Sequence, residues 1–279
     1  MDPLRLLLEG ELEIHGRLVV SSNDALFCSV RLAADEPSEL ATVAQAVYKP
    51  IRFERPLWDF PDGTLAQREV AAYLVSEATG WGIVPPTVLR DGPAGPGMVQ
   101  LWIGGSDQEE QGDAEADPGN GLAGATGNVT GDPAPFRAID PADAWELVRS
   151  ADPRLRPMAI FDAVVNNTDR KGGHILPVRR APDGGELHLY GVDHGVCFSV
   201  EPKLRTVLWA WRGAPLSAPE LDVVSRLRSE LDGEFEHRLR PLLTREEIRA
   251  LRARVESLLV DRCFPQPLLD RPAIPWPPF

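Results

Sequence analysis

Residues 161–176 of the chain read FDAVVNNTDRKGGHIL, and the fold is inferred outward from this stretch. A mostly apolar run with helical spacing leads into a polar segment, and two glycines and a histidine precede a second apolar run. This order predicts a helix, a polar loop and a short strand. The loop carries Asp169, Lys171 and His174 between two buried elements, which is where a rigid scaffold usually presents chemically active groups.

A second polar element follows the next predicted strand. Residues 187–195 read LHLYGVDHG, so an apolar run delivers Asp193, and Gly195 frees the backbone two residues later. An Asp-x-Lys-x-x-His loop, followed by a strand and Asp-x-Gly, has the layout of a kinase catalytic loop and its metal-binding Asp. In this layout Asp169 takes the place of the catalytic Asp, and His174 stands where kinases keep a metal-binding Asn.

The residues 167–170, NTDR, resemble still more closely the type II phosphatidylinositol 4-kinases and the HipA-like kinases. Most of residues 1–260 is similar to an actinobacterial family described as phosphatidylinositol 3-/4-kinase-like. The resemblance implies an α+β, two-lobed protein-kinase-like fold, with an antiparallel sheet plus one helix in the N-lobe and a mainly helical C-lobe. It also implies that ATP and a divalent metal bind between the lobes.

The same resemblance divides the chain into four parts. Residues 1–103 form the N-lobe and end at a hinge, and residues 134–263 form the C-lobe with the catalytic loop. Between them, residues 104–133 are rich in Gly, Asp and Glu and contain no Lys or Arg. Such a segment cannot bury enough apolar surface to offset the entropy of ordering, so we expect it to be disordered. Residues 264–279 form a Pro-rich tail that either wraps the C-lobe or hangs free.

A lysine and a glutamate of the N-terminal half are candidates for binding the nucleotide. Residues 42–50, TVAQAVYKP, predict a strand that ends near Lys49, whose charge would neutralise α- and β-phosphate oxygens. Residues 65–78 have helical spacing and carry Glu69, which could pair with Lys49 and hold it in one pose. A lysine at a strand end and a solvated glutamate are the ordinary alternatives.

Two further nucleotide contacts are expected in the N-lobe. Residues 11–20 and 25–30 predict a hairpin, and its polar tip is either a surface turn or a phosphate-covering loop formed by Ser21, Ser22 and Asn23. Two more strands are predicted at 84–90 and 97–103. The second would enter the hinge, where backbone groups at Gln100, Leu101 and Trp102 are candidates for contact with adenine.

The resemblance assigns the catalytic work to a few groups. Asp169 would accept the proton of the attacking hydroxyl, and Lys171 or Arg170 would offset charge on the transferring phosphoryl group. Asp193 would bind Mg²⁺ directly, as a hard oxygen ligand suits. His174 is a poorer ligand for Mg²⁺ and favours Mn²⁺, so three roles are open to it: it binds metal, hydrogen-bonds a phosphate or only braces the loop.

The segment after Asp193 carries basic and aromatic residues in alternation. Lys203, Arg205 and Arg212 interleave with two tryptophans, Trp209 and Trp211. This pattern is open to two interpretations: an acceptor platform, or tryptophans that pack under the lower lobe, which the apolar spacing favours. Beyond it, amphipathic helices are predicted near 218–232 and 244–262, the second with a Thr-x-x-Glu capping box.

Composition limits the partners and the compartment. A formal net charge of −13 argues against a general nucleic-acid or anionic-membrane binder. The sequence contains neither an apolar run long enough to span a membrane nor a convincing leader, so we expect no stable membrane insertion. Three widely spaced cysteines fit reduced thiols in a cytoplasm. The oligomeric state is not encoded in any pattern that we can interpret.

These patterns together predict an ATP-dependent phosphotransferase that uses Mg²⁺ or Mn²⁺ and a hydroxyl acceptor. The acceptor is left open between a protein Ser/Thr, a small alcohol and an inositol lipid, with the lipid disfavoured by the negative charge. The alternative is a pseudokinase that binds nucleotide as an interaction module. A third possibility is transfer of AMP from a nucleotide bound in the reverse direction.

Overall fold

The computed structural model describes residues 2–18, 25–33, 41–103, 137–138, 141–179 and 185–279. The candidate loop tip at Ser21, Ser22 and Asn23, and the acidic segment 104–133, lie outside these described residues. No helix in the described part of the chain is both long and apolar enough to cross a bilayer.

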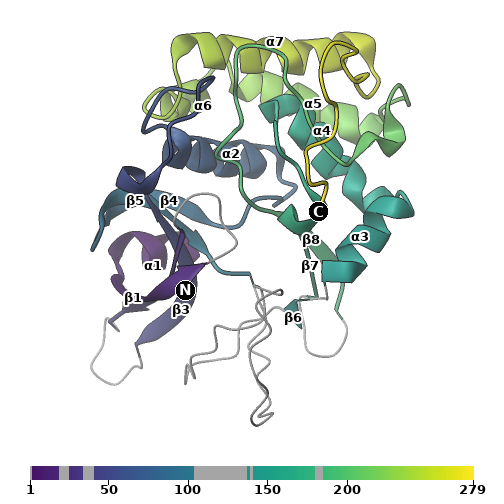
Figure 1. Cartoon of the computed structure of the whole chain (residues 1–279). Helices are drawn as coiled ribbons and strands as arrows, with labels where there is room; N and C mark the ends of the chain where they lie inside the picture. Colours follow the sequence, from purple (N-terminus) through teal and green to yellow (C-terminus); the bar gives the residue numbers. More distant parts are fainter. Residues whose placement is uncertain (1, 19–24, 34–40, 104–136, 139–140, 180–184) are drawn as a thin grey trace.

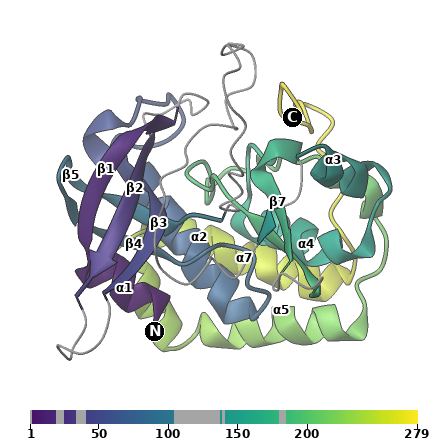
Figure 2. The same cartoon turned by 90° about the horizontal axis from the view of Figure 1, so that it is seen from below.

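The N-terminal part is built on a five-stranded antiparallel sheet (Figures 1 and 2). Its spatial order is β1-β2-β3-β5-β4, so the predicted hairpin is present as the β1–β2 pair. The strand β3 that carries Lys49 lies between β2 and β5. The strands are β1 (Glu11–Leu18), β2 (Ala25–Leu32), β3 (Thr42–Pro50), β4 (Thr87–Gly92) and β5 (Gly95–Leu101).

A short helix that we did not predict, α1 (Pro3–Glu9), packs on this sheet. Asp2 caps it by accepting a hydrogen bond from the Leu4 backbone N–H at 2.9 Å, and Pro3 occupies its first turn. Both are sequence signals of a helix start. Leu6 and Leu7 then enter the apolar core of the sheet, which explains why this short helix is stable in its place.

Helix α2 (Leu65–Thr79) joins the sheet to the helical part of the molecule. In both views it lies between the N-terminal sheet and the helices α5 and α7 (Figures 1 and 2). It ends at Gly80, whose φ of 70° suits the left-handed region that glycine adopts readily. Arg68 on α2 is 1% exposed, pairs with Glu247 of α7, and donates to the Cys197 carbonyl at 2.8 Å.

The C-terminal part is mainly helical, with a small antiparallel sheet of order β6-β7-β8. A large apolar core of α2, α4, α5 and α7 residues holds it together. The predicted capping box is present, because Thr244 and Glu247 each bond the other's backbone at the start of α7. The helices are α3 (Pro141–Arg149), α4 (Arg156–Val165), α5 (Ala218–Glu230), α6 (Glu234–Leu239) and α7 (Arg245–Asp261). The strands are β6 (Arg137–Ala138), β7 (Ile175–Arg179) and β8 (Leu187–Gly191).

Short 3₁₀ turns link these elements, at Ile51–Phe53, Pro153–Leu155, Gly172–His174 and Trp209–Trp211. The antiparallel N-terminal sheet and the mainly helical C-terminal part confirm the α+β, two-lobed architecture expected from the sequence.

The C-terminal residues lie along the helical part and do not hang free. The Ala273 carbonyl accepts hydrogen bonds from the Thr206 backbone N–H at 3.1 Å and from the Trp209 indole at 2.8 Å. The Pro278 carbonyl accepts from the Gly172 backbone N–H at 2.8 Å. Trp209 is therefore committed to packing against this tail, which favours the packing interpretation of the tryptophan-rich segment.

Replacing Arg68 by Met should lower the free energy of unfolding by about 3 kcal/mol, because it leaves the buried carboxylate of Glu247 without its cation. Urea denaturation followed by far-UV circular dichroism measures the change. A matched control is Arg249→Met, which breaks an ion pair with Glu246 on the exposed surface of α7, the helix that also carries Glu247. This control should leave the midpoint unchanged. Equal midpoints for the two variants would contradict the structural role of the buried pair.

Candidate active site

Lys49 is the cation around which the candidate site is arranged. Its Nζ lies 2.7 Å from Oε1 of Glu69 on α2 and 2.9 Å from Oδ1 of Asp193, which follows β8. The expected pair between Lys49 and Glu69 is therefore present. Burial disfavours the lysine charge, but the Asp193 and Glu69 carboxylates outweigh it, so the pKa of Lys49 lies above its usual range. The lysine is held as a cation between the two lobes.

Glu69 holds two parts of the site at once. While Oε1 binds Lys49, Oε2 accepts a hydrogen bond from the His194 backbone N–H at 2.8 Å. The Glu69 carboxylate is 2% exposed, so both bonds form out of contact with bulk water. One side chain of α2 thus fixes the position of Lys49 on β3 and the position of the Asp-His-Gly segment relative to it.

The catalytic-loop candidate begins where α4 ends. Asn166 closes the helix in the left-handed region, with φ of 52°, a conformation that asparagine tolerates better than most residues. The Asn167 side chain then accepts a hydrogen bond from the Asp169 backbone N–H at 3.0 Å. Lys171 Nζ lies 3.3 Å from Oδ2 of Asp169. The two asparagines therefore set the course of the loop, as expected from their hydrogen-bonding capacity.

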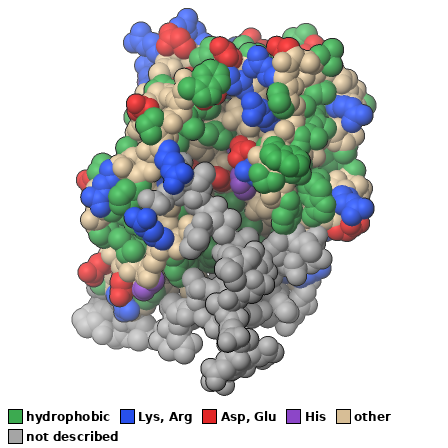
Figure 3. Space-filling model, in the orientation of Figure 1, with side chains coloured by type: hydrophobic (Ala, Val, Ile, Leu, Met, Phe, Trp, Pro, Cys, Tyr) green, Lys and Arg blue, Asp and Glu red, His purple; other side chains and the backbone are tan. Residues whose placement is uncertain are grey.

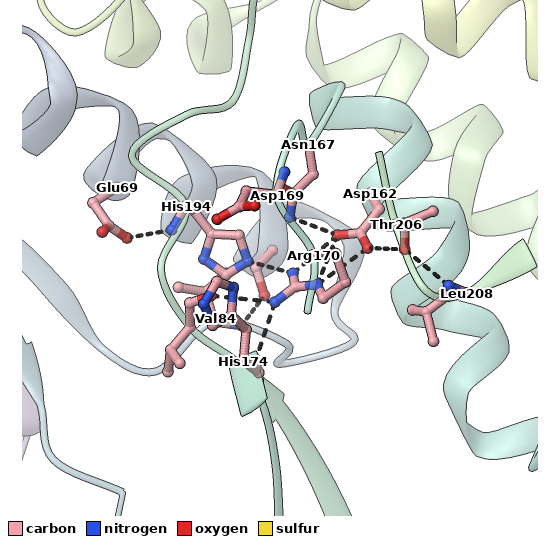
Figure 4. A network of polar contacts seen from close by, with 12 residues as sticks. Glu69, Val84, Asp162, Asn167, Asp169, Arg170, His174, His194, Thr206 and Leu208 are labelled. Atoms are coloured by element: carbon pink, nitrogen blue, oxygen red, sulfur yellow. Dashed lines mark hydrogen bonds and ion pairs between the residues drawn. The ribbon is translucent and has the colours of Figure 1, made fainter. Parts of the chain in front are cut away.

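Arg170 is not presented to the cleft, although we proposed it from the sequence as a phosphoryl-binding residue. Its side chain and that of Asp162 are both 0% exposed, and they form an ion pair at 2.9 Å (Figure 4). The guanidinium also donates to the carbonyls of His174 and Val192 and bonds His194 Nε2 at 2.6 Å. With these partners Arg170 supports the loop from its buried side, and it cannot reach a phosphate without breaking these bonds.

The same buried network includes further polar groups around Asp162. The Asp162 carboxylate also accepts hydrogen bonds from the Asn167 amide at 3.0 Å and the Thr206 hydroxyl at 3.1 Å (Figure 4). His194 joins the loop to the Asp-His-Gly segment through its bond to Arg170. The ion pair thus links three segments of the chain, which explains why a charged pair is kept in the interior.

Asp193 has φ of 62°, an uncommon conformation for a residue other than glycine. The nearby Lys49 cation holds the pKa of the Asp193 carboxyl well below its usual range, so this group is ionised. Its Oδ2 lies 3.6 Å from Nε2 of His174, and burial lowers the pKa of His174. At neutral pH the pair is therefore a carboxylate beside an uncharged imidazole.

These groups face a common hollow. It has about 540 Å³ of empty space, including the part that is open to solvent. Figure 3 shows Asp, Glu and His atoms gathered in the middle of one face, with Lys and Arg side chains nearby. Four predicted site residues line the hollow, namely Lys49, Glu69, Asp169 and Asp193. Burial in this hollow raises the pKa of Asp169, against the opposing effect of Lys171.

The residues predicted for the hinge do not line this hollow. The Gln100 side chain points into the sheet and donates to the Thr87 hydroxyl at 2.8 Å. The backbone N–H groups of Leu101 and Trp102 are already donated to the carbonyls of Pro86 and Gln45, at 2.9 Å each. Contact between adenine and these two residues would therefore have to use their carbonyl groups.

Glu54 lines the same hollow, and sequence reasoning missed it. Its carboxylate accepts hydrogen bonds from the Leu65 and Ala66 backbone N–H groups, at 3.0 and 2.8 Å, and so caps the start of α2. The usual capping position, Thr64, makes no such bond. Nothing local in the sequence signals a cap that comes from eleven residues upstream.

The site offers few side chains that could bind a metal ion. The described residues contain no cluster of three or more His, Cys, Asp or Glu side chains suited to an ion. Asp193 and His174 offer two donors, and Nδ1 of His174 is buried without a hydrogen-bond partner. A site with few protein ligands fits an ion that is completed by phosphate oxygens and water, as is usual for Mg²⁺ with nucleotides.

The fold is that of the atypical kinases. The Golgi casein kinase superposes with a TM-score of 0.52 at 13% identity, over 92% of this chain and 72% of that one. The Golgi casein kinase with Mn/ADP bound gives 0.51 at 13% identity, over 92% and 74%. The hydra Fam20 structure with sugar gives 0.52 at 14% identity, over 92% and 86%. At these identities the likeness defines the fold.

Sequence comparison identifies the family. No family model matches the sequence. Protein Rv2133c of Mycobacterium tuberculosis is 45% identical over 285 residues, covering 100% of this chain and 96% of that protein. The chain therefore belongs to the same family as Rv2133c. The resemblance to the phosphatidylinositol kinases in particular remains a prediction from the loop motif.

We expect Lys49→Met to raise the pKa of Asp193 to at least the ordinary aspartate value of about 3.9, because the cation that stabilises the carboxylate is lost. Carboxyl-carbon NMR titration of the metal-free protein measures this pKa. The control is Lys171→Met, which should raise the pKa of Asp169 and leave that of Asp193 low. An unchanged Asp193 pKa in the Lys49 variant would contradict the arrangement of the site.

Proposed function

We propose that the protein is an ATP-dependent phosphotransferase that moves the γ-phosphate to a hydroxyl acceptor. The observation that carries this proposal is the position of Lys49. Its Nζ lies between carboxylates that are 20 and 144 residues away in the sequence, and Asp169 lines the same hollow. A cation, its bracing carboxylate and two further aspartates in kinase order are the groups that phosphoryl transfer requires.

Each group then has a defined task. Lys49 binds α- and β-phosphate oxygens, and Glu69 keeps its ammonium in place while it does so. Asp193, with His174 beside it, is the group suited to hold a divalent cation. Such an ion neutralises negative charge on the phosphates when it is bound. The uncharged imidazole of His174 is a better ligand for Mn²⁺ than for Mg²⁺.

Asp169 accepts the proton of the attacking hydroxyl. Its raised pKa makes it a stronger base than an exposed aspartate, which favours proton transfer near neutral pH. Lys171, 3.3 Å from Asp169, supplies a positive charge near the transferring group. Arg170 takes no direct part, because the buried ion pair with Asp162 occupies it, and it acts as a positioning residue.

The acceptor belongs to one of three classes: a protein Ser/Thr, a small alcohol or an inositol lipid. One structural neighbour is a casein kinase with Mn/ADP bound, and another was solved with sugar. These neighbours support a nucleotide and a divalent ion as cofactors, and the choice of ATP is part of our proposal. We place the protein in the cytoplasm on the basis of its cysteine usage.

A second candidate function is that of a pseudokinase, a nucleotide-binding module with little transfer activity. The observation that favours it is His174, which offers a nitrogen where kinases use an amide oxygen. Its Nδ1 is buried with no partner among the described residues, so the hydrogen-bonding capacity of this side chain is not fully satisfied. Both functions predict that the protein binds nucleotide, but only the phosphotransferase removes the γ-phosphate from it.

Saturating MgATP should stabilise the wild-type protein by about 2.7 kcal/mol at a concentration 100 times its Kd, and raise its melting temperature accordingly. Lys49→Met and Asp193→Asn should each lose most of this shift, because one removes the phosphate-binding cation and the other weakens metal binding. Differential scanning fluorimetry measures it. Asp222→Asn, an exposed carboxylate on α5, is the control and should respond as the wild type does. Full stabilisation of both site variants would refute the assignment.

Asp169→Asn should slow the single-turnover loss of γ-phosphate from bound ATP by about 10²- to 10⁴-fold while leaving the thermal shift with MgATP intact, because only the base is removed. Rapid-quench assays with γ-labelled ATP measure the rate. Equal rates in the variant and the wild type would contradict the role of Asp169. A wild type that binds ATP and shows no loss of label would establish the pseudokinase.

A further inference from the structure

Arg205 is held directly against the catalytic-loop candidate. Its backbone N–H donates to the Asn167 carbonyl at 2.9 Å, and its carbonyl accepts from the Arg170 backbone N–H at 3.1 Å. These two bonds place Arg205 alongside the residues that precede Arg170, which include Asp169. Its backbone is thus fixed by the same loop that positions the proposed base.

The pairing also determines which way the Arg205 side chain is directed. Arg170 and Thr206 form a parallel bridge, and both side chains bond the buried carboxylate of Asp162. In extended backbone, successive side chains alternate between the two faces. The residues that precede this bridge, Asp169 and Arg205, are therefore directed to the opposite face. Asp169 lines the hollow. Arg205 is not among the lining residues of the hollow, but the alternation directs it to the same face of the paired backbones as Asp169.

Among the described residues, Arg205 has no anionic partner, whereas Lys203 and Arg170 each have one. Lys203 is 8% exposed, pairs with Asp59 at 3.0 Å, and lies 5.1 Å from the centre of the Trp58 ring. Arg170 pairs with Asp162. No ion pair found within the described part of the chain includes Arg205, and its Nε is shielded from solvent without a hydrogen-bond acceptor.

A shielded, unpaired guanidinium nitrogen is costly, because it has given up water without gaining an acceptor. Only Nε of Arg205 is shielded in this way, and the side chain as a whole is half-buried, so its two terminal nitrogens are the donors open to a ligand. The guanidinium presents donors in a planar fork that matches a carboxylate or a phosphate. Arg205 therefore lies beside Asp169 and has no hydrogen-bond acceptor or anionic partner for its side chain among the described residues, which leaves it able to bind an anionic group.

We propose that Arg205 binds an anionic group of the acceptor, a carboxylate or a phosphate ester that lies near the hydroxyl to be phosphorylated. This inference rests on the proposed phosphotransferase function and narrows its substrate class to hydroxyl compounds that carry negative charge. The carboxylate of Asp169 repels such a compound, and Arg205 offsets that repulsion and sets the distance of the hydroxyl from the base. Two sources share this chemistry: an acidic peptide and the phosphate ester of a small alcohol.

Binding of matched charged and neutral probes tests the proposal. One pair is glycerol 3-phosphate and glycerol, and the other is a serine peptide with Glu beside the serine and the same peptide with Gln. Isothermal titration calorimetry measures each probe with and without MgADP. The variants are Arg205→Gln and Arg205→Lys, and the control is Arg226→Gln, which removes an exposed positive charge on α5. Unfolding midpoints verify that all variants are folded.

In at least one pair, the wild type and the Arg226 control should bind the charged probe about tenfold more tightly than the neutral one. Arg205→Gln should bind both members of that pair equally, and Arg205→Lys should keep part of the preference because it keeps the charge without the fork. The probe pair in which the charged member binds more tightly shows whether the anionic group belongs to an acidic peptide or to the phosphate ester of a small alcohol. A preference retained in Arg205→Gln, or absent from both pairs in the wild type, would overturn the proposal. Loss of MgADP binding with the preference intact would overturn the proposed function alone.

Discussion

The site depends on one charge arrangement, the ammonium of Lys49 held between Glu69 and Asp193. Without the lysine, two carboxylates would face each other across a partly dry cleft, and without either carboxylate the lysine would be a buried cation with too few partners. Because Lys49 lies on β3, Glu69 on α2 and Asp193 after β8, their mutual attraction also fixes how the sheet, α2 and the helical part meet. The same contact therefore serves both the fold and the chemistry.

A second buried charge pair positions the loop that carries the proposed base. Arg170 and Asp162, both inaccessible to solvent, join the end of α4, the segment near Thr206 and the Asp-His-Gly turn. A pair of this kind contributes little net stability compared with apolar packing, but it permits few alternative arrangements of the groups around it. It holds Asp169 on one face of the loop while Arg170 occupies the other. The buried face thus determines what the exposed face can present to a ligand.

Much of the fold could be predicted from local patterns. The limits of β3 and α2, the hairpin and the capping box of α7 follow from alternation, helical spacing and caps, which are properties of neighbouring residues. The helix α1 was missed although Asp2 and Pro3 signal its start. For the site, the roles of Lys49, Glu69, Asp169 and Asp193 could be predicted because their order along the chain resembles that of the corresponding kinase residues.

The remainder could not be predicted because it depends on residues distant in the sequence. The burial of Arg170 depends on Asp162 from the preceding helix turns and on His194 from a later segment, so its charge alone suggested a ligand. Glu54 caps a helix from outside it, and Gln100 turns to Thr87 on the adjacent strand. The lack of a partner for Arg205 among the described residues becomes visible only when the surrounding carboxylates are placed in space.

The most direct test of the central claim is a crystal structure with a non-hydrolysable ATP analogue and Mn²⁺, with the ion located by its anomalous scattering. The account predicts the triphosphate in the hollow, Lys49 Nζ within hydrogen-bonding distance of its α- or β-phosphate oxygens, and the manganese peak at the Asp193 carboxylate. A nucleotide bound elsewhere, or a manganese peak remote from Asp193, would contradict it.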